Sequence, residues 1–114
     1  MRYKDRLDCA LIVADAPSGA AAAGVFTTNR FCAAPVEICK SRLSKSRRSK
    51  GIVVNAGIAN ACTGGEGLRC AEEMTRMTAA ALSVAETDIL VASTGVIGQQ
   101  IRLDPLRDTL PQLV

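Results

Sequence analysis

The residues best suited to chemistry are Thr94 and Gly95, which follow the apolar run at residues 89–92. An aliphatic, β-branched run that ends in small residues predicts a buried strand leading into a tight loop. At such a strand end, the Thr94 hydroxyl and the unshielded backbone N–H of Gly95 can point at one spot. Two donors aimed at one point stabilise the oxyanion that develops in acyl transfer. The pair is a candidate oxyanion hole without a nucleophile of its own. The alternative is a plain strand-to-helix turn in which Thr94 caps the next element.

A second candidate is the glycine-rich segment 57–67, with four glycines in eleven residues. It lies between a predicted strand and a predicted helix, where phosphates are often held. Neither the P-loop pattern nor the G-x-G-x-x-G spacing is present, which favours a loop with tight turns over a nucleotide site. Asn55 and Asn60 flank the loop, and we expect their amides to hold its backbone rather than a ligand.

Charge and cysteine usage narrow the possible functions. The net charge is +3, and six basic residues and no acid lie within residues 40–50. No aromatic residue is interleaved for base stacking, so this basic segment is interpreted as a solvated connection and not a nucleic-acid surface.

Five cysteines occur without a C-x-x-C pair and without any histidine, which argues against a metal site. Their odd number, with no secretory signal or membrane-spanning stretch, indicates reduced thiols in a cytoplasmic protein.

The pattern along the chain predicts an α/β layered fold with helices on a mixed sheet. Expected strands cover residues 8–14, 20–28, 35–39, 51–56 and 89–93. The first two should form an antiparallel hairpin, and the fourth should be buried on both faces. Two helices are expected, at residues 68–84 and from residue 104 to 110, with Asp104 as N-cap and Pro105 at the first position. Only three aromatic residues support the core, a hint that the unit is incomplete.

Four motifs extend the interpretation beyond local chemistry. They are FTTNR at 26–30, AAPV at 33–36, NAGIANACTG at 55–64 and STGVIG at 93–98. In this order and spacing they resemble the N-terminal part of the ornithine acetyltransferase family, also called glutamate N-acetyltransferase or arginine biosynthesis J. Ile58 and Ala56 depart from the residues most common in the family, which are Asn and Ser.

The resemblance implies a concrete activity. Family members transfer an acetyl group from N-acetylornithine to glutamate in arginine biosynthesis, and some also use acetyl-CoA, which makes them multifunctional. They cleave themselves before a threonine, and this residue becomes the N-terminal nucleophile of a β chain, with its own amine as base. Residues matching Thr94 and Gly95 supply the oxyanion hole. The implied fold is a layered α/β sandwich like that of self-processing aminopeptidases, and no cofactor is implied.

The same resemblance implies that residues 1–114 are one α-chain-like fragment of a larger acetyltransferase. No segment resembles the cleavage motif, so the nucleophile and the substrate-contacting residues should lie in a downstream β-type chain, with which a hetero-oligomer forms. The fragment alone should be inactive. Two alternatives stay open: a non-catalytic remnant or partner subunit that binds a β-type chain, and an anion-binding module that uses loop 57–67.

Overall fold

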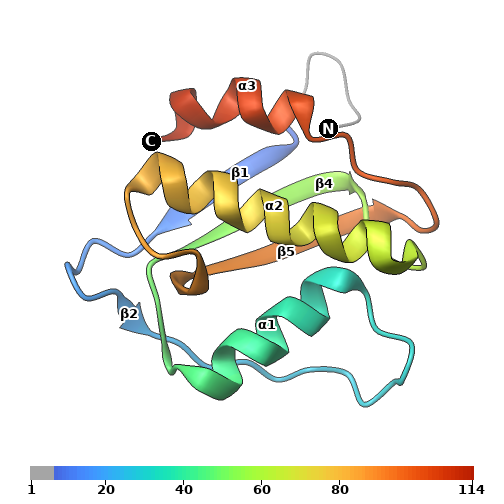
Figure 1. Ribbon diagram of the computed structural model, residues 1–114, viewed down its shortest axis with the longest axis horizontal. Helices are drawn as coiled ribbons and strands as arrows, with labels where there is room; N and C mark the ends of the chain where they lie inside the picture. Colours follow the sequence, from blue (N-terminus) through green and yellow to red (C-terminus); the bar gives the residue numbers. More distant parts are fainter. Residues whose placement is uncertain (1–6) are drawn as a thin grey trace.

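The structure, a computed structural model, describes residues 7–114, and the charged start of the chain lies outside the described residues (Figure 1). Its centre is a three-stranded mixed sheet with strand order β1-β4-β5. Strand β1 (Cys9–Val13) runs antiparallel to β4 (Gly51–Ile58), and β4 runs parallel to β5 (Ile89–Val96). A separate two-stranded ribbon pairs β2 (Ala20–Ala21) with β3 (Arg48–Ser49). The α/β fold class with a mixed sheet is confirmed.

Three helices cover one face of this sheet (Figure 1). Helix α2 (Gly64–Leu82) connects β4 to β5 through the short 3₁₀ helix η1 (Glu86–Asp88) and packs across both strands. Helix α1 (Ala34–Lys45) lies along β5, and α3 (Asp104–Leu113) lies beside β1. Within residues 7–114, no helix combines the length and the apolar character needed to cross a membrane.

The core forms between the helices and alternate strand residues. Val53 of β4 and Ile89 of β5 are fully buried, and they pack with Met74 from α2 and Leu106 from α3. Side chains of a strand alternate between the two sheet faces, so one face of each strand supplies the core. The core therefore ties together strands that are distant in the sequence.

The opposite sheet face has no helix over it among the described residues. Ile52, Val54 and Ala56 of β4 are only half-buried, and Ile12 of β1 is 58% exposed. We call this surface the open sheet face, formed by residues 10, 12, 52, 54, 56, 90, 92 and 94. The prediction of a strand at 51–56 is confirmed, but the expectation that it is buried on both faces is wrong for the part of the chain that the structure describes.

Two expected strand features are wrong. The first strand pairs with β4 instead of forming a hairpin with residues 20–28, of which only Ala20 and Ala21 are in a strand. Small side chains in this segment offer little area to bury, whereas the apolar β4 gives β1 a better partner. Residues 35–39, expected as a strand, begin helix α1, because Pro35 suits a first helical turn and Ile38 and Cys39 bury one face.

The helix predictions need three adjustments. Within residues 7–114 there are three helices instead of two, because α1 begins in the segment expected as a strand. Helix α2 begins at Gly64, four residues before the predicted start. Helix α3 is present, but its N-cap is Leu103; Asp104 lies in the first turn, where its carboxylate accepts a hydrogen bond from Arg107 at 3.1 Å.

Candidate functional site

Thr94 lies in the last third of β5, directly opposite Ala56 of β4. Its side chain is on the open sheet face and is exposed. The strand continues through Val96, and the next helix begins only at Asp104. The alternative in which Thr94 caps the following helix is therefore wrong. The Thr94 hydroxyl is not engaged by any group of residues 7–114, so it can donate outward.

Gly95 packs against the backbone of β4. Its φ of +132° is a conformation that side chains rarely allow. A Cβ on Gly95 would lie 2.2 Å from the carbonyl carbon of Gly57, which itself has a φ of +98°. The two glycines are register partners. Only glycine at position 95 allows the two strand ends to approach this closely.

The inner edge of β5 faces β4. The Asp88 carbonyl accepts a hydrogen bond from the Lys50 N–H at 2.7 Å, and the Val96 carbonyl accepts one from the Ala59 N–H at 2.9 Å. These even-numbered residues stand at the two ends of the strand. In a parallel ladder, alternate residues direct their backbone groups to opposite edges. The odd-numbered residues between them therefore face outward.

Side chains of α1 cap the first half of this outer edge. The Arg42 guanidinium donates to the Ile89 carbonyl, and the Cys39 thiol donates to the Val91 carbonyl at 3.2 Å. By the same alternation, the N–H of Gly95 points to the outer edge, beyond the region that α1 caps. The Gly95 N–H and the exposed Thr94 hydroxyl are thus both available at one end of one strand.

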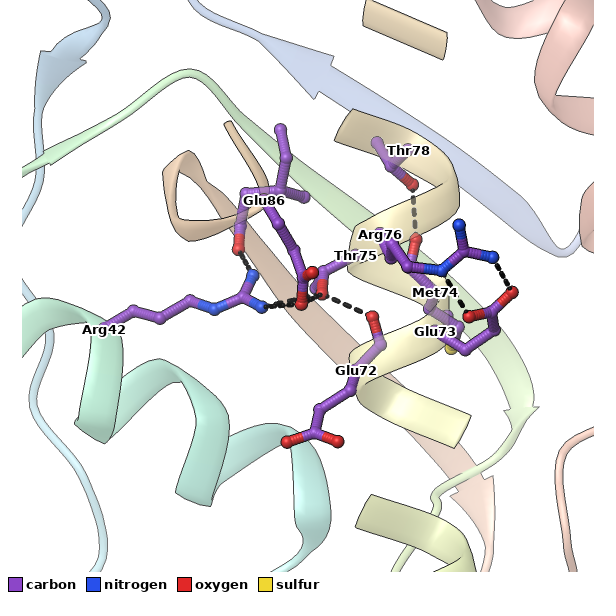
Figure 2. A network of polar contacts seen from close by, with 9 residues as sticks. Arg42, Glu72, Glu73, Met74, Thr75, Arg76, Thr78 and Glu86 are labelled. Carbon is purple, nitrogen blue, oxygen red and sulfur yellow. Dashed lines mark hydrogen bonds and ion pairs between the residues drawn. The ribbon is translucent and has the colours of Figure 1, made fainter. Parts of the chain in front are cut away.

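Arg42 anchors the start of β5 (Figure 2). Besides the Ile89 carbonyl, its guanidinium donates to Thr75 Oγ1 at 2.8 Å and to Glu86 Oε1 at 2.9 Å. Only 12% of the Arg42 side chain is exposed. One side chain of α1 therefore joins α2, η1 and β5. Nothing in the local pattern of residues 40–50 marks Arg42 apart from its basic neighbours, so the sequence did not reveal this role.

Asn55, which is buried, and Ser93, which is half-buried, form a polar pair behind the candidate site. They are register partners, and Ser93 Oγ donates to Asn55 Oδ1 at 2.5 Å. Asn55 is 1% exposed, and its Nδ2 donates to the carbonyl of Ile58 at 2.9 Å. The expectation that Asn55 holds loop backbone is confirmed, while its pairing with Ser93 was not expected. An asparagine within an apolar run was the available signal.

The glycine-rich loop holds itself together. Asn60 is fully buried with a φ of 51°; its Nδ2 donates to the Gly67 carbonyl at 2.8 Å, and its Oδ1 accepts from Thr63 Oγ1 at 2.7 Å. The structural role expected for Asn60 is confirmed. A cavity of about 350 Å³ lies at the first turns of α1 and α2, lined by Arg30 but also by the Glu37 carboxylate. The negative charge of the Glu37 carboxylate would repel an anion that entered this cavity.

Two of the cysteine thiols, those of Cys9 and Cys70, are partly buried. Burial raises the pKa of the Cys9 and Cys70 thiols, which keeps them protonated and weakly nucleophilic. All five cysteines are free, and residues 7–114 contain no cluster of three or more potential metal ligands. The described residues thus offer hydrogen-bond donors at the strand end, and neither Cys9 nor Cys70 is activated as a nucleophile.

The fold and site define an α/β protein whose sheet presents a hydroxyl and a backbone N–H at one strand end, beside an open apolar face. The family model of the ArgJ family matches residues 1–114. The chain therefore belongs to the ArgJ family, as its motifs indicated.

Relatives with sequence similarity carry the family's name. The arginine biosynthesis bifunctional protein ArgJ of Thermosynechococcus vestitus is 50% identical over 106 residues, covering 93% of this chain and 25% of the relative. The chloroplastic ArgJ of Ostreococcus lucimarinus is 48% identical over 108 residues, covering 95% of this chain and 23% of the relative. The chain thus spans about a quarter of the length of the curated relatives that it matches.

Two solved structures share the fold. The ArgJ protein of Bacillus halodurans superimposes with a TM-score of 0.84 at 34% identity, covering 92% of this chain and 54% of that one. The ornithine acetyltransferase of Mycobacterium tuberculosis, determined in complex with ornithine, has a TM-score of 0.86 at 36% identity, covering 92% and 56%.

Proposed function

We propose that this chain is the α-type part of an enzyme that transfers an acetyl group from N-acetylornithine to glutamate. Thr94 Oγ1–H and Gly95 N–H form its oxyanion hole. The observation that supports this role is their placement: one exposed hydroxyl and one outward-directed N–H on consecutive residues at the uncapped end of β5. The Mycobacterium tuberculosis relative in complex with ornithine supports the substrate class.

The chemistry follows from two donors and a nucleophile supplied elsewhere. An N-terminal threonine of a β-type chain attacks the acetyl carbonyl carbon, and its own amine accepts the hydroxyl proton. The carbonyl oxygen becomes an oxyanion, which Thr94 and Gly95 stabilise by hydrogen bonds. The protonated N-terminal amine returns its proton to the ornithine nitrogen, the C–N bond breaks, and ornithine leaves an acetyl-enzyme behind. The amine of glutamate then attacks the acetyl-enzyme and gives its proton to the N-terminal amine, and the same two donors stabilise the second intermediate. Cleavage of the C–O bond to the threonine, whose hydroxyl takes the proton back, releases N-acetylglutamate.

The open sheet face supports a second part of the proposal, the β-type chain as partner. The residues of this face are apolar except for Thr94. A contiguous apolar patch on a sheet marks an interaction surface. We place the complete enzyme in the cytoplasm as a hetero-oligomer of α and β chains formed by autocatalytic cleavage of one precursor. Use of acetyl-CoA as a further donor would make the enzyme bifunctional, as the names of the relatives say of them.

Acetyl transfer from N-acetylornithine to glutamate tests this function. The chain is assayed alone and then co-expressed with the downstream segment of a related enzyme; we expect activity only in the pair. In the active pair, Thr94→Ala should lower turnover about 10²–10³-fold, the usual cost of losing one oxyanion donor. Thr94→Ser keeps the hydroxyl and is the matched control. Undiminished turnover of Thr94→Ala would refute the role of Thr94.

The same experiment separates the alternative of a non-catalytic subunit. A pair that associates but transfers no acetyl group indicates a remnant that keeps only the layered fold. Anion binding by loop 57–67 has less support, because the Asn60 amide is engaged within the loop and the Glu37 carboxylate lines the adjoining cavity.

A further inference from the structure

The hydrogen-bonded pair of Asn55 and Ser93 lies directly beside the candidate oxyanion hole. Ser93 directly precedes Thr94, and its side chain lies on the helix-covered face while that of Thr94 lies on the open sheet face. The 2.5 Å bond from Ser93 Oγ to Asn55 Oδ1 therefore holds β5 at the residue before the candidate oxyanion hole.

The other end of the Asn55 amide acts on its own strand, β4. In an extended strand, a residue and the third residue after it are about 10 Å apart, too far for an asparagine side chain. Asn55 Nδ2 nevertheless reaches the Ile58 carbonyl at 2.9 Å, because the chain turns at Gly57 with its φ of +98°. The amide thus stabilises the bend at the end of β4.

This bend is the surface against which Gly95 packs. A Cβ on Gly95 would lie 2.5 Å from the Gly57 carbonyl oxygen and 2.6 Å from the Ile58 nitrogen. The peptide between Gly57 and Ile58 therefore sets where the Gly95 backbone can lie. One Asn55 side chain holds both the residue before Thr94 and the peptide that supports Gly95.

We infer that Asn55 and Ser93 are positioning residues that align the Thr94 hydroxyl with the Gly95 N–H. This inference rests on the proposed function. Catalytic groups must be held to within about 0.5 Å by their surrounding hydrogen bonds to act together. Asn55 is buried, and the Ser93 hydroxyl is bonded to it on the helix-covered face, so both act through the strand and not as donors to the substrate. Their effect should therefore appear in turnover rather than in substrate binding.

The test uses the complete acetyltransferase that carries this segment. Ser93→Ala removes the donor to Asn55 and should lower kcat roughly 10- to 100-fold, because misplacing a catalytic group by about 1 Å can cost that much. KM should stay within about twofold, as expected when only transition-state stabilisation is lost. Ser93→Thr keeps the hydroxyl and should restore kcat.

Thr78→Val is the matched control for loss of a buried hydroxyl. Thr78 is fully buried in α2, and its Oγ1 donates only to the Met74 carbonyl at 2.8 Å, away from the strand ends. Its kcat should be unchanged. Melting temperatures of all variants establish that the compared proteins are folded. If Ser93→Ala does not fold, Asn55→Asp takes its place. This variant keeps the acceptor for Ser93 but removes the donor to Ile58, and the same fall in kcat is expected.

A double-mutant cycle separates the positioning role of Ser93 from the oxyanion-hole role of Thr94. If Ser93 acts through Thr94, adding Ser93→Ala to Thr94→Ala causes little further loss of kcat. Losses that multiply, or an unchanged kcat in Ser93→Ala while Thr94→Ala is impaired, overturn the positioning role and leave the oxyanion hole standing. Full turnover of Thr94→Ala overturns the oxyanion hole, and with it the positioning role.

Discussion

Gly95 of β5 lies directly against the backbone of Gly57 in β4, so closely that a Cβ on Gly95 would meet the Gly57 carbonyl carbon at 2.2 Å. This approach brings together two strand ends that are 38 residues apart in the sequence. It also explains why a glycine follows Thr94: no other residue fits the available space with a φ of +132°. The geometry of the candidate site therefore depends on this contact.

Gly95→Ala should be strongly destabilising. Strained backbone and a clash with backbone atoms each cost about 1–3 kcal/mol, and both apply here. Gly98→Ala is the matched control, because Gly98 has a φ of +79° but nothing within 4 Å of its Cβ position. It should lose only about 1–2 kcal/mol. Denaturant unfolding of both variants measures the difference; equal losses would contradict the close approach.

Two glycines in the first turn of α2 should respond oppositely to alanine. A Cβ on Gly67 would lie 1.8 Å from Thr63 Oγ1 and 2.5 Å from Asn60 Oδ1, so Gly67→Ala should break the bond between them and destabilise the protein. A Cβ on Gly65 would have its nearest neighbour 3.7 Å away, at the end of the Arg69 side chain. Gly65→Ala should be neutral or stabilise by up to about 1 kcal/mol, since alanine favours the helix. Melting temperatures decide; destabilisation by Gly65→Ala would contradict this account.

Arg42→Lys should weaken the attachment of α1 to β5. A lysine ammonium cannot reproduce the planar set of donors that reaches Thr75, Glu86 and the Ile89 carbonyl (Figure 2). We expect a loss of about 2–3 kcal/mol, as for hydrogen bonds to a charged group. Amide hydrogen exchange in the first half of β5 should also become faster.

Arg76→Lys is the control for this substitution. Arg76 pairs with Glu73 on the surface of α2, with 60% of the arginine side chain exposed. Such pairs contribute little, so stability should not measurably change. A similar loss in both variants would mean that the Arg42 contacts are no stronger than a surface ion pair.

The Glu73–Arg76 pair predicts a small pH dependence of stability. The side-chain hydrogen bond from Arg76 lowers the pKa of Glu73 below its ordinary value of 4.5. A carboxyl group with a lowered folded-state pKa stabilises the fold above its unfolded pKa, and this stabilisation is lost as pH falls through the folded pKa. The difference in melting temperature between wild type and Glu73→Gln should therefore be present at neutral pH and disappear in acid.

Glu72→Gln provides the comparison for the pH series. The Glu72 carboxylate points away from the polar network in Figure 2, so its replacement removes one carboxylate of α2 without touching the Glu73–Arg76 pair. A Glu73→Gln difference that is constant with pH, or that grows in acid, would contradict the assigned sign.

The sequence by itself determined the local elements and the family. The apolar run before Thr94, the period of the helix after residue 67 and the four motifs depend on neighbouring residues, so they predicted β5, α2 and membership of the ArgJ family. Only the tertiary structure decided that β1 pairs with β4, that residues 35–39 are helical and that one sheet face has no helix over it within residues 7–114. It also brought Asn55 to Ser93 across 38 residues. Strand pairing and the burial of a face are set by contacts between segments far apart in the chain, which local patterns do not record.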